Sequence, residues 1–408
     1  MYKILQGDTL EKISKKIYGT GIHDDHILRA NPGLTSTLIP GTTIAIPKLP
    51  DYPGDLPQIL GIKEVEDVQV YIDGNRFEFW TDVEINLSLD SIDSFVFSAP
   101  FDPYAPGFRE LFKPFTFKKL ILNVGKERLI TGVIVGNHPS LDANSNTISV
   151  SGYATPGILH DCNMPINSYP IEYNTVNLRD IAKALTKPFG VDTIFKSEPK
   201  GNFEQIVLNA TDKIFDFLAK LAKQKNFIMS NNEYGALTFF QAITDTNTTV
   251  ADLSEGKAPL MSITPNFNEQ EYYSHVTGLA YESIATIGDK YTIKNPFLKD
   301  VIRPFTYTNN NTTASDLKTA VEAKAGRMFA EMVSYSIEVS SWHDQNNDLW
   351  RPNTVVSLYA PRAMIYEKYY FVIRSVFLKR DKSSYTATLE LVLPGSLSGI
   401  IPTELPWG

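Results

Sequence analysis

The first 48 residues combine short extended runs with a helical pattern. Leu10, Ile13 and Ile17 recur at the i, i+3, i+7 spacing of one helix face, directly after the turn Gly7-Asp8-Thr9. The segment Asn31-Pro32-Gly33 is typical of a stop after a second short helix. The pattern therefore predicts, in order, a strand at residues 2–5, a helix from residue 10, a helix over residues 23–30 and a strand over residues 42–46.

A proline-rich segment separates this unit from the rest of the chain. Four prolines fall between residues 47 and 57, together with Gly54 and two aspartates. Such a composition favours the extended polyproline conformation and gives a semi-rigid spacer. We therefore expect a first domain at residues 1–48 and a linker at residues 49–65.

Period-two alternation dominates residues 66–160. Val83, Ile85 and Leu87 alternate with polar residues, as in a strand with one buried face. Similar runs are separated by turns such as Asp73-Gly74-Asn75, and their regular spacing is typical of an antiparallel barrel or sandwich. Further strands are expected at residues 68–72, 77–80, 94–98, 120–124, 129–135 and 147–152.

Helical spacing returns in residues 161–258. Asn177 is placed to cap one helix, and Thr211 is placed to cap a second, whose apolar residues recur at i, i+3, i+4, i+7 and i+8. Two apolar runs around residues 231–235 predict a hairpin. This region is therefore expected to be a small α/β insert.

Residues 259–408 return to β character and contain one long helix. The predicted fold is thus α+β and mainly β: a βααβ module, then two antiparallel β-barrel domains that flank the small α/β insert. The buried stripe of the long helix is expected to be Leu317, Val321, Ala325, Met328 and Met332. Strands are expected at residues 335–340, 354–359, 369–379 and 385–393.

Composition narrows the classes of function. The 408 residues include 38 Lys and Arg against 46 Asp and Glu, a net charge of −8, which argues against a protein that reads nucleic acid or binds anionic membranes. The single cysteine, Cys162, excludes a disulfide framework within the chain and a cysteine-rich zinc site. Apolar runs are far shorter than a membrane helix needs, and the N-terminus lacks an apolar leader, so we expect a chain made in the cytoplasm without membrane insertion. No cofactor is expected.

Three groups of side chains invite a chemical interpretation, each with a simpler alternative. The cluster of residues 23–26 (His-Asp-Asp-His) is a candidate metal site or a solvated helix start. Asp90 and Asp93 are a candidate glycosidase pair or plain surface charge. Cys162 beside His160 is a candidate nucleophile or an inert thiol. The simpler interpretation is favoured in each case, so no catalytic residue and no metal ligand is predicted.

Two tryptophans in the last region, Trp342 and Trp350, stand close together in sequence. We expect them to be packing or interface anchors rather than a platform for a ligand.

The N-terminal unit resembles a LysM module. The resemblance is carried by the run Tyr2-Lys-Ile-Leu-Gln-Gly-Asp-Thr-Leu10, then Tyr18-Gly19, Ala30-Asn31-Pro32, and Ile39-Pro40-Gly41 before the last strand. LysM modules bind glycans that contain N-acetylglucosamine, such as peptidoglycan. The resemblance implies a groove with Gly7, Asp8, Thr9 and Leu10 on one wall, and Asn31, Pro32, Leu34, Leu38, Ile39 and Pro40 on the other.

Two alternatives to sugar binding stay open for this module. It can be a docking domain for a neighbouring protein in a particle. Asp8 and Thr9 can also serve only as the cap of the first helix, which stabilises the module whether or not a sugar binds.

The remaining residues resemble the baseplate hubs of contractile tails, the Mu-type hub and phage late-control D proteins. The resemblance rests on the order of several weak motifs over about 320 residues. Asn353 departs from the pattern, because relatives often carry Gly after the preceding Pro. The motifs are Val70-Tyr-Ile-Asp-Gly74, Trp80-Thr-Asp-Val83, Ile130-Thr-Gly132-Val133, Leu185-Thr-Lys-Pro-Phe-Gly190-Val, Ile214-Phe-Asp-Phe-Leu218, Gly235-Ala-Leu-Thr238 and Leu349-Trp350-Arg-Pro352-Asn353-Thr-Val355.

This resemblance implies a structural protein of a virion tail. Such hubs are homotrimers in which two similar β domains per chain give a pseudo-sixfold ring that matches the tail tube above, while the threefold central spike docks below. Nucleic acid would only pass through the lumen, where the negative charge of three chains would repel it. The competing hypothesis is a LysM-targeted cell-wall hydrolase or its accessory subunit.

Overall fold

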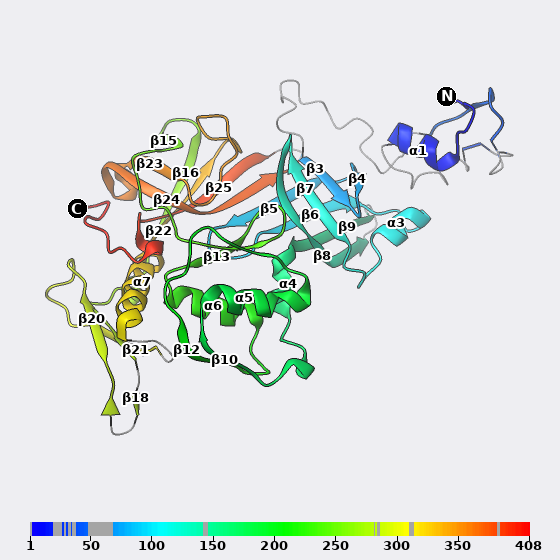
Figure 1. Cartoon of the computed structure of the whole chain (residues 1–408). Helices are drawn as coiled ribbons and strands as arrows, with labels where there is room; N and C mark the ends of the chain where they lie inside the picture. The colour runs from blue at the N-terminus through cyan, green and yellow to red at the C-terminus, as the bar shows by residue number, and fades with distance from the viewer. Residues whose placement is uncertain are drawn as a thin grey trace. The chain divides into compact units, whose positions relative to one another are not determined.

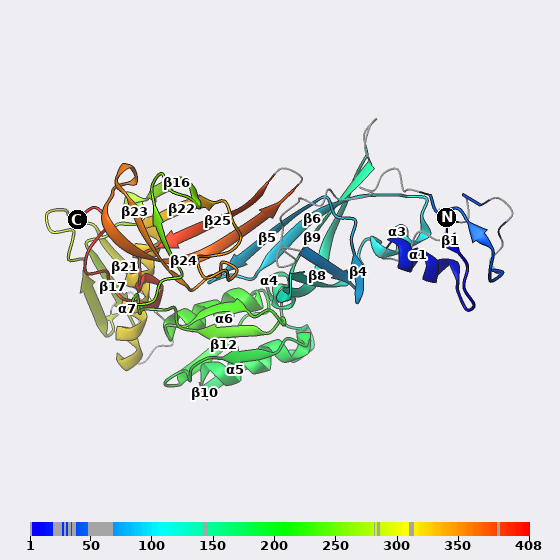
Figure 2. The same cartoon turned by 90° about the horizontal axis from the view of Figure 1, so that it is seen from above.

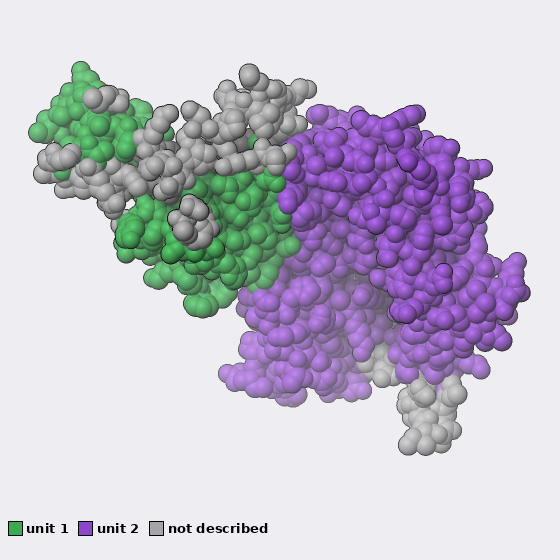
Figure 3. All heavy atoms as spheres, turned by 180° about the vertical axis from the view of Figure 1, so that it is seen from behind, with its two compact units in different colours: residues 1–84, 94–154, 380–382 green, residues 85–93, 155–379, 383–408 purple. Residues whose placement is uncertain are grey.

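The computed structural model describes residues 2–18, 27, 30–31, 34, 38–47, 68–141, 146–280, 282–283, 286–309, 314–381 and 384–408. The chain divides into two compact units, coloured separately in Figure 3. Unit 1 comprises residues 1–84, 94–154 and 380–382, and unit 2 comprises residues 85–93, 155–379 and 383–408. The predicted linker at 49–65 and the His-Asp-Asp-His cluster at 23–26 lie outside the described residues.

The N-terminal module is built around four isoleucines. Strand β1 (Tyr2–Lys3) pairs antiparallel with β2 (Thr43–Ile44), and α1 (Leu10–Tyr18) follows the first turn. The side chains of Ile4, Ile13, Ile27 and Ile44 are almost fully buried against one another. The first helix and the strands at both ends are therefore present, whereas nearly all of the predicted helix at 23–30 falls outside the described residues.

The rest of unit 1 is an antiparallel sheet with alternating burial. Its order is β6-β9-β8-β7-β3-β4, and every second side chain of strands such as β3 is buried, as the period-two pattern requires. Figure 1 shows this sheet in cyan and teal with helix α3 (Pro106–Leu111) beside it. The strands are β3 (Val68–Ile72), β4 (Asn75–Phe77), β6 (Ser94–Pro100), β7 (Lys119–Val124), β8 (Glu127–Leu141) and β9 (Asn146–Ala154).

Strand β5 (Asp82–Ser88) contributes residues to both units, with the division after residue 84. Its burial alternates strictly, with Val83, Ile85 and Leu87 buried. The alternation that predicted this strand is therefore confirmed residue by residue.

Unit 2 contains strands in the order β16-β22-β25-β24, with β23 on β24 and β15 in parallel on β23. Aromatic side chains such as Tyr335 and Phe371 fill its core, with ring centroids 5.1 Å apart. The strands are β15 (Ala251–Ser254), β16 (Leu260–Phe267), β22 (Val333–Val339), β23 (Val355–Ala360), β24 (Ile365–Arg380) and β25 (Tyr385–Val392).

The insert of unit 2 is α/β, as predicted. Figure 2 shows its two main helices beside the strand pair β10–β12. A second small sheet has the order β11-β14-β13. The elements are α4 (Ile158–Asp161), β10 (Ile171–Val176), α5 (Leu178–Thr186), β11 (Thr193–Phe195), β12 (Phe203–Leu208), α6 (Ile214–Gln224), β13 (Ile228–Asn231) and β14 (Leu237–Phe240).

One of the two predicted helix caps is confirmed and the other is wrong. Asn177 is the N-cap of α5, and its side chain accepts a hydrogen bond from the Asp180 amide at 2.9 Å. Helix α6 begins after Lys213, not after Thr211, and its N-cap makes no side-chain capping bond. The chain makes a further turn first, because Asp212 bonds back to the Asn209 amide at 3.1 Å.

The long helix α7 (Ala314–Met332) packs against a three-stranded sheet that the sequence analysis did not predict. Val276 of this sheet packs with four residues of the predicted helix stripe, and the fifth, Met332, is buried as well. The sheet consists of β17 (His275–Leu279), β20 (Lys290–Lys294) and β21 (Pro304–Thr308), and a short pair β18 (Glu282–Ser283) and β19 (Thr286–Ile287) lies nearby in sequence.

The expectation of closed β-barrels is not supported by the strand pairing. Among the described strands, the path of unit 2 ends at β16 and β15, which do not pair with each other, and that of unit 1 ends at the three-residue strand β4. Period-two alternation shows which face of a strand is buried, but closure also depends on stagger and tilt between strands. The fold is therefore mainly β with open sheets. None of the described helices is both long and apolar enough to cross a membrane.

Candidate functional site

The turn before α1 holds two of the residues expected in a glycan groove, and both stabilise the module. The Asp8 carboxylate accepts a bond from the Leu5 amide at 2.7 Å and from the Tyr2 hydroxyl at 3.0 Å. The Leu5 bond is the main reason why the pKa of Asp8 lies below its usual value. Thr9 caps α1, because its hydroxyl accepts the Lys12 amide at 3.2 Å.

Asn31, on the opposite predicted wall, is also engaged within the module. Its side-chain amide donates to the carbonyls of Ile27 (2.7 Å) and Ala45 (2.8 Å), and its oxygen accepts the Ala45 amide at 2.7 Å. Asn31 therefore fixes the loop against the last strand and uses most of its hydrogen-bonding capacity in doing so.

Main-chain bonds join the strand before the Gly7 turn to the loop before the last strand. The Ile4 amide donates to the Thr42 carbonyl at 2.9 Å, and the Gly41 amide donates to the Ile4 carbonyl at 2.8 Å. The loop of residues 38–41 thus lies beside the strand that leads into the Gly7 turn, where the backbone is left-handed with φ of +86°. Leu10, Leu34 and Leu38 pack partly into the isoleucine core, whereas Gly7, Thr9, Ile39 and Pro40 are exposed. Pro32 lies outside the described residues.

Asp93 is not the surface charge that the sequence analysis expected. It is 7 % exposed, and its two carboxylate oxygens accept bonds from the Ser88 amide and the Asn231 side chain, both at 2.8 Å. Burial raises its pKa to about 7, against the lowering effect of these hydrogen bonds and of Arg351. Its backbone amide also donates to Asn231 at 2.8 Å, so Asp93 fastens the end of β5 to the β13–β14 hairpin.

Asp90 is engaged separately from Asp93. The Arg374 guanidinium donates to both oxygens of Asp90, with the shortest distance 2.9 Å, and also contacts Glu331 at 3.2 Å. The two aspartates therefore each hold a structural contact of their own, which gives no support to a glycosidase pair.

The remaining candidates from the sequence also make packing contacts. The His160 ring stacks on Phe215 with centroids 3.8 Å apart, and burial lowers the pKa of His160. Trp342 and Trp350 are fully buried, and their indole N–H groups donate to the carbonyls of Thr386 (2.8 Å) and Ser341 (2.9 Å). The expectation that these tryptophans are packing anchors is confirmed.

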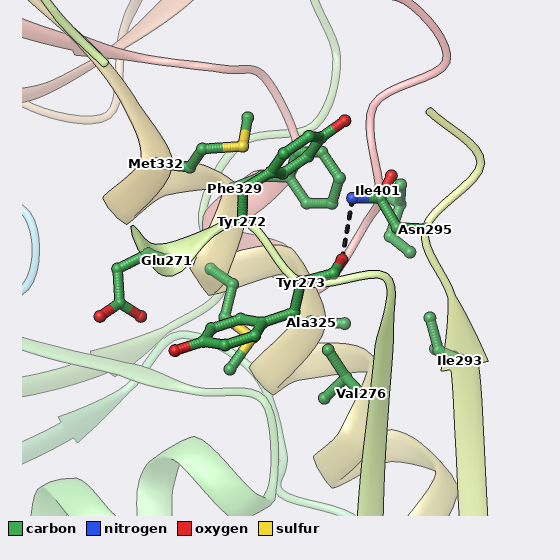
Figure 4. A pocket seen from close by; sticks show the side chains of 11 residues that line it. Glu271, Tyr272, Tyr273, Val276, Ile293, Asn295, Ala325, Phe329, Met332 and Ile401 are labelled. Atoms are coloured by element: carbon green, nitrogen blue, oxygen red, sulfur yellow. Dashed lines mark hydrogen bonds between the residues drawn. The ribbon is translucent and has the colours of Figure 1, made fainter. Parts of the chain in front are cut away.

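The cavity beside α7 is too small for a ligand. Figure 4 shows Tyr272, Tyr273 and Phe329 around it, with Asn295 donating to the Tyr273 carbonyl at 3.0 Å. Its volume is about 10 Å³, which is room for one water molecule at most. Within the described part of the chain, no group of three or more His, Cys, Asp or Glu side chains is arranged to hold a metal ion.

Two family models match the chain. Residues 2–47 match the LysM domain, and residues 156–241 match the second domain of the gp44-like baseplate hub proteins. The baseplate hub protein gp44 of Escherichia phage Mu is 22% identical over 337 residues, which cover 79% of this chain and 87% of that protein. This chain is therefore similar to the Mu baseplate hub protein over most of its length, and its first residues match the LysM domain.

Solved structures agree with this relationship at the level of the fold. A 43 kDa tail protein of prophage MuSo2 from Shewanella oneidensis superposes with a TM-score of 0.68 at 22% identity, covering 81% of this chain and 99% of that one. A tail protein from Neisseria meningitidis gives a TM-score of 0.67 at 18% identity, with 81% and 97% covered. A type VI secretion component from E. coli gives 0.53 at 12% identity, with 82% and 79% covered.

Sequence reasoning missed two features of this hub relative. The Asp93–Asn231 contact joins residues 138 positions apart, and no local pattern could have revealed it. The second is the contact of Arg374 with Asp90, which joins residues 284 positions apart.

Proposed function

We propose that this protein is a structural baseplate hub of a phage tail or of a phage-tail-like injection particle. The observation that supports the proposal most is the extent of the similarity. The sequence match covers 87% of the Mu hub protein, and the structural match covers 99% of the MuSo2 tail protein. Its location is the tail of the virion, and its role is mechanical rather than catalytic.

The hub acts as a trimeric adaptor between the sixfold tail tube and the threefold central spike. Each unit contributes a set of mainly antiparallel strands, and two such sets per chain would supply the repeated surfaces that a threefold protein needs to contact a sixfold ring. The many aromatic side chains, 12% of the residues, are suited to subunit interfaces.

Two measurements on the full chain test this role. Native mass spectrometry should give three times the 45.7 kDa mass of one chain, and a peptidoglycan activity gel should show no cleared zone. A monomer at working concentration would contradict the trimer. A cleared zone would favour the alternative of a cell-wall hydrolase.

The LysM domain contacts peptidoglycan through the exposed edge formed by Thr9, Ile39 and Pro40. The Ile39 side chain is 69 % exposed, and an exposed apolar side chain of this kind can cover the face of a sugar ring. The alternative is that the same edge docks a baseplate partner.

Retention of the full chain on purified peptidoglycan decides between the two. Ile39→Ser should lower the retained fraction at least tenfold, because the apolar wall is lost while the isoleucine core stays intact. Leu141→Ser, at an equally exposed site outside the module, should leave retention unchanged. Wild-type protein that fails to bind at high concentration would leave docking as the role of the domain.

A further inference from the structure

A groove of about 470 Å³ in unit 2 has a strand on one side and a helix on the other. The strand is β12 and the helix is α6, and Figure 2 shows the two next to each other. We call this the β12–α6 groove. Its apolar lining consists of Ile206 and Val207 from β12 and of Phe217 and Leu221 from α6.

The groove follows an edge of β12 and not one of its faces. Consecutive side chains of a strand point to opposite faces, and burial reflects this here, since Ile206 is 1 % exposed and Val207 is 52 % exposed. Both residues nevertheless line the groove, which places it along the edge between the two faces. The main chain of β12 is thus one wall of the groove.

This edge of β12 has no partner among the described strands. β12 pairs only with β10, and no residue of β10 lines the groove, which therefore lies on the other edge. An unpaired edge presents a row of main-chain N–H and C=O groups to any strand that approaches. Within β10, Thr175 has a left-handed backbone with φ of +54°, whereas no residue of β12 has a positive φ. β12 is therefore the regular one of the two strands, and its free edge is suited to pairing.

A buried acceptor without a partner lines the same groove. The side-chain oxygen of Gln224 has no hydrogen-bond partner among the described residues, and Gln224 is only 6 % exposed. A buried acceptor that stays unpaired destabilises the protein. The Gln224 oxygen therefore favours an occupant that brings N–H donors into the groove, as a peptide does.

The charges of the groove are balanced. Asn209 donates to the Asp212 carboxylate from its main-chain amide at 3.1 Å and from its side-chain amide at 3.0 Å. Lys213 donates to the Asp161 carbonyl at 2.5 Å. The charged lining is Asp212, Lys213, Asp216 and Lys220, two residues of each sign. Charge complementarity therefore favours an uncharged occupant over an acidic or a basic one.

We propose that an extended, uncharged segment of a partner protein adds a strand to the free edge of β12 and lies against α6. Its main chain pairs with that of β12, its alternate apolar side chains contact Val207 and Phe217, and one of its N–H groups reaches the Gln224 oxygen. Main-chain pairing supplies affinity in this mode of recognition, and the side chains in the groove supply specificity. This binding site goes beyond the hub role and does not depend on it.

Binding of a probe peptide to the full chain tests the proposal. The probe is a fluorescein-labelled seven-residue peptide of alternating threonine and valine, followed by fluorescence anisotropy. The matched probe has the same side chains, but each main-chain nitrogen is methylated, so it cannot donate to a strand. We expect the first probe to bind at least tenfold more tightly than the second, with little dependence on salt because it is uncharged. Equal binding of the two probes, or no binding of the first, would overturn the proposal.

Hydrogen exchange shows whether the probe pairs with β12. With the first probe bound, the main-chain amides of residues 203–208 should exchange at least tenfold more slowly, because those on the free edge become hydrogen-bonded. Exchange that slows elsewhere in the chain but not in this segment would contradict strand addition.

Two variants locate the site. Val207→Asp should weaken the probe at least tenfold, because it places a charge in the apolar part of the groove. Val301→Asp, at a valine of the same unit that is 49 % exposed and does not line the groove, should change binding less than twofold. Gln224→Met removes the unpaired oxygen and should weaken the probe about fivefold, which is the effect of losing one ordinary hydrogen bond.

The same variants give the outcomes that would contradict the proposal. Equal loss of binding in the two valine variants would show that the probe binds elsewhere. A folded Val207→Asp chain that no longer assembles like the wild type in native mass spectrometry would identify the occupant as a second copy of this chain, and would overturn the choice of partner.

Discussion

At Asn353 the backbone is left-handed, with φ of +67°. The resemblance to hub proteins leads us to expect Gly at this position, and Asn is one of the few other residues that adopt this conformation at low cost. The Asn353 side chain also accepts the Ile243 amide at 2.8 Å, and its own amide donates to the Ile373 carbonyl at 2.9 Å. The departure from the family pattern therefore keeps the turn and adds a contact to the insert.

Asp93 gives unit 2 a specific dependence on pH. Its pKa is raised from 3.8 to about 7 in the folded protein. Between pH 3.8 and about pH 7 the Asp93 carboxyl is therefore protonated in the folded state and ionised in the unfolded state. Stability must then fall as pH rises through this window, and the loss is complete above about pH 7.

Asp93→Asn should flatten this dependence. Wild-type protein should lose about 3 kcal/mol of unfolding free energy between pH 5 and pH 8 from this group, whereas the variant should lose none of it. The variant should be less stable at pH 5, since one hydrogen bond to Asn231 is disturbed. Urea unfolding at both pH values gives the difference, and Asp300→Asn, at an exposed position, should retain the wild-type slope. An unchanged slope in Asp93→Asn would show that another group carries the effect.

At the scale of the elements, local signals were reliable where the deciding contact was local. Asn177 was predictable as a cap because its bond reaches only to Asp180. Thr211 was a wrong prediction because Asp212 and Lys213 intervene before α6 begins. The sheet at β17, β20 and β21 was missed although Tyr291 and Ile293 alternate with polar residues, because strands of five residues carry too short a pattern to be decisive.

The two caps can be compared directly by mutation. Asn177→Ala should destabilise the protein by about 1 kcal/mol, because the amide at Asp180 loses its acceptor. Thr211→Ala should cost less than about 0.5 kcal/mol, as an exposed substitution away from the helix start. Chemical unfolding measures both, and a larger cost at Thr211 than at Asn177 would contradict the assignment of the caps.

At the scale of the whole molecule, patterning correctly predicted a mainly β chain, whereas the closed β-barrels that were also predicted are not supported by the strand pairing. Alternation in β3 and β5 identified buried faces, whereas the open order of both sheets depends on which distant strands meet. The hub relationship came from the order of motifs, not from any one residue. The polar and apolar pattern of a single chain does not determine how many chains assemble. The proposed trimer is therefore tested by native mass spectrometry.

The burial of Trp342 and Trp350 makes them an intrinsic fluorescence probe of the folded state. Both indoles lie in unit 2, are buried away from water and donate hydrogen bonds to main-chain oxygens. Their fluorescence is therefore that of indoles in an apolar environment as long as the unit stays folded. With Trp80 and Trp407 replaced by Phe, a shift toward longer wavelength would report the opening of this unit within an assembling particle, with no added dye.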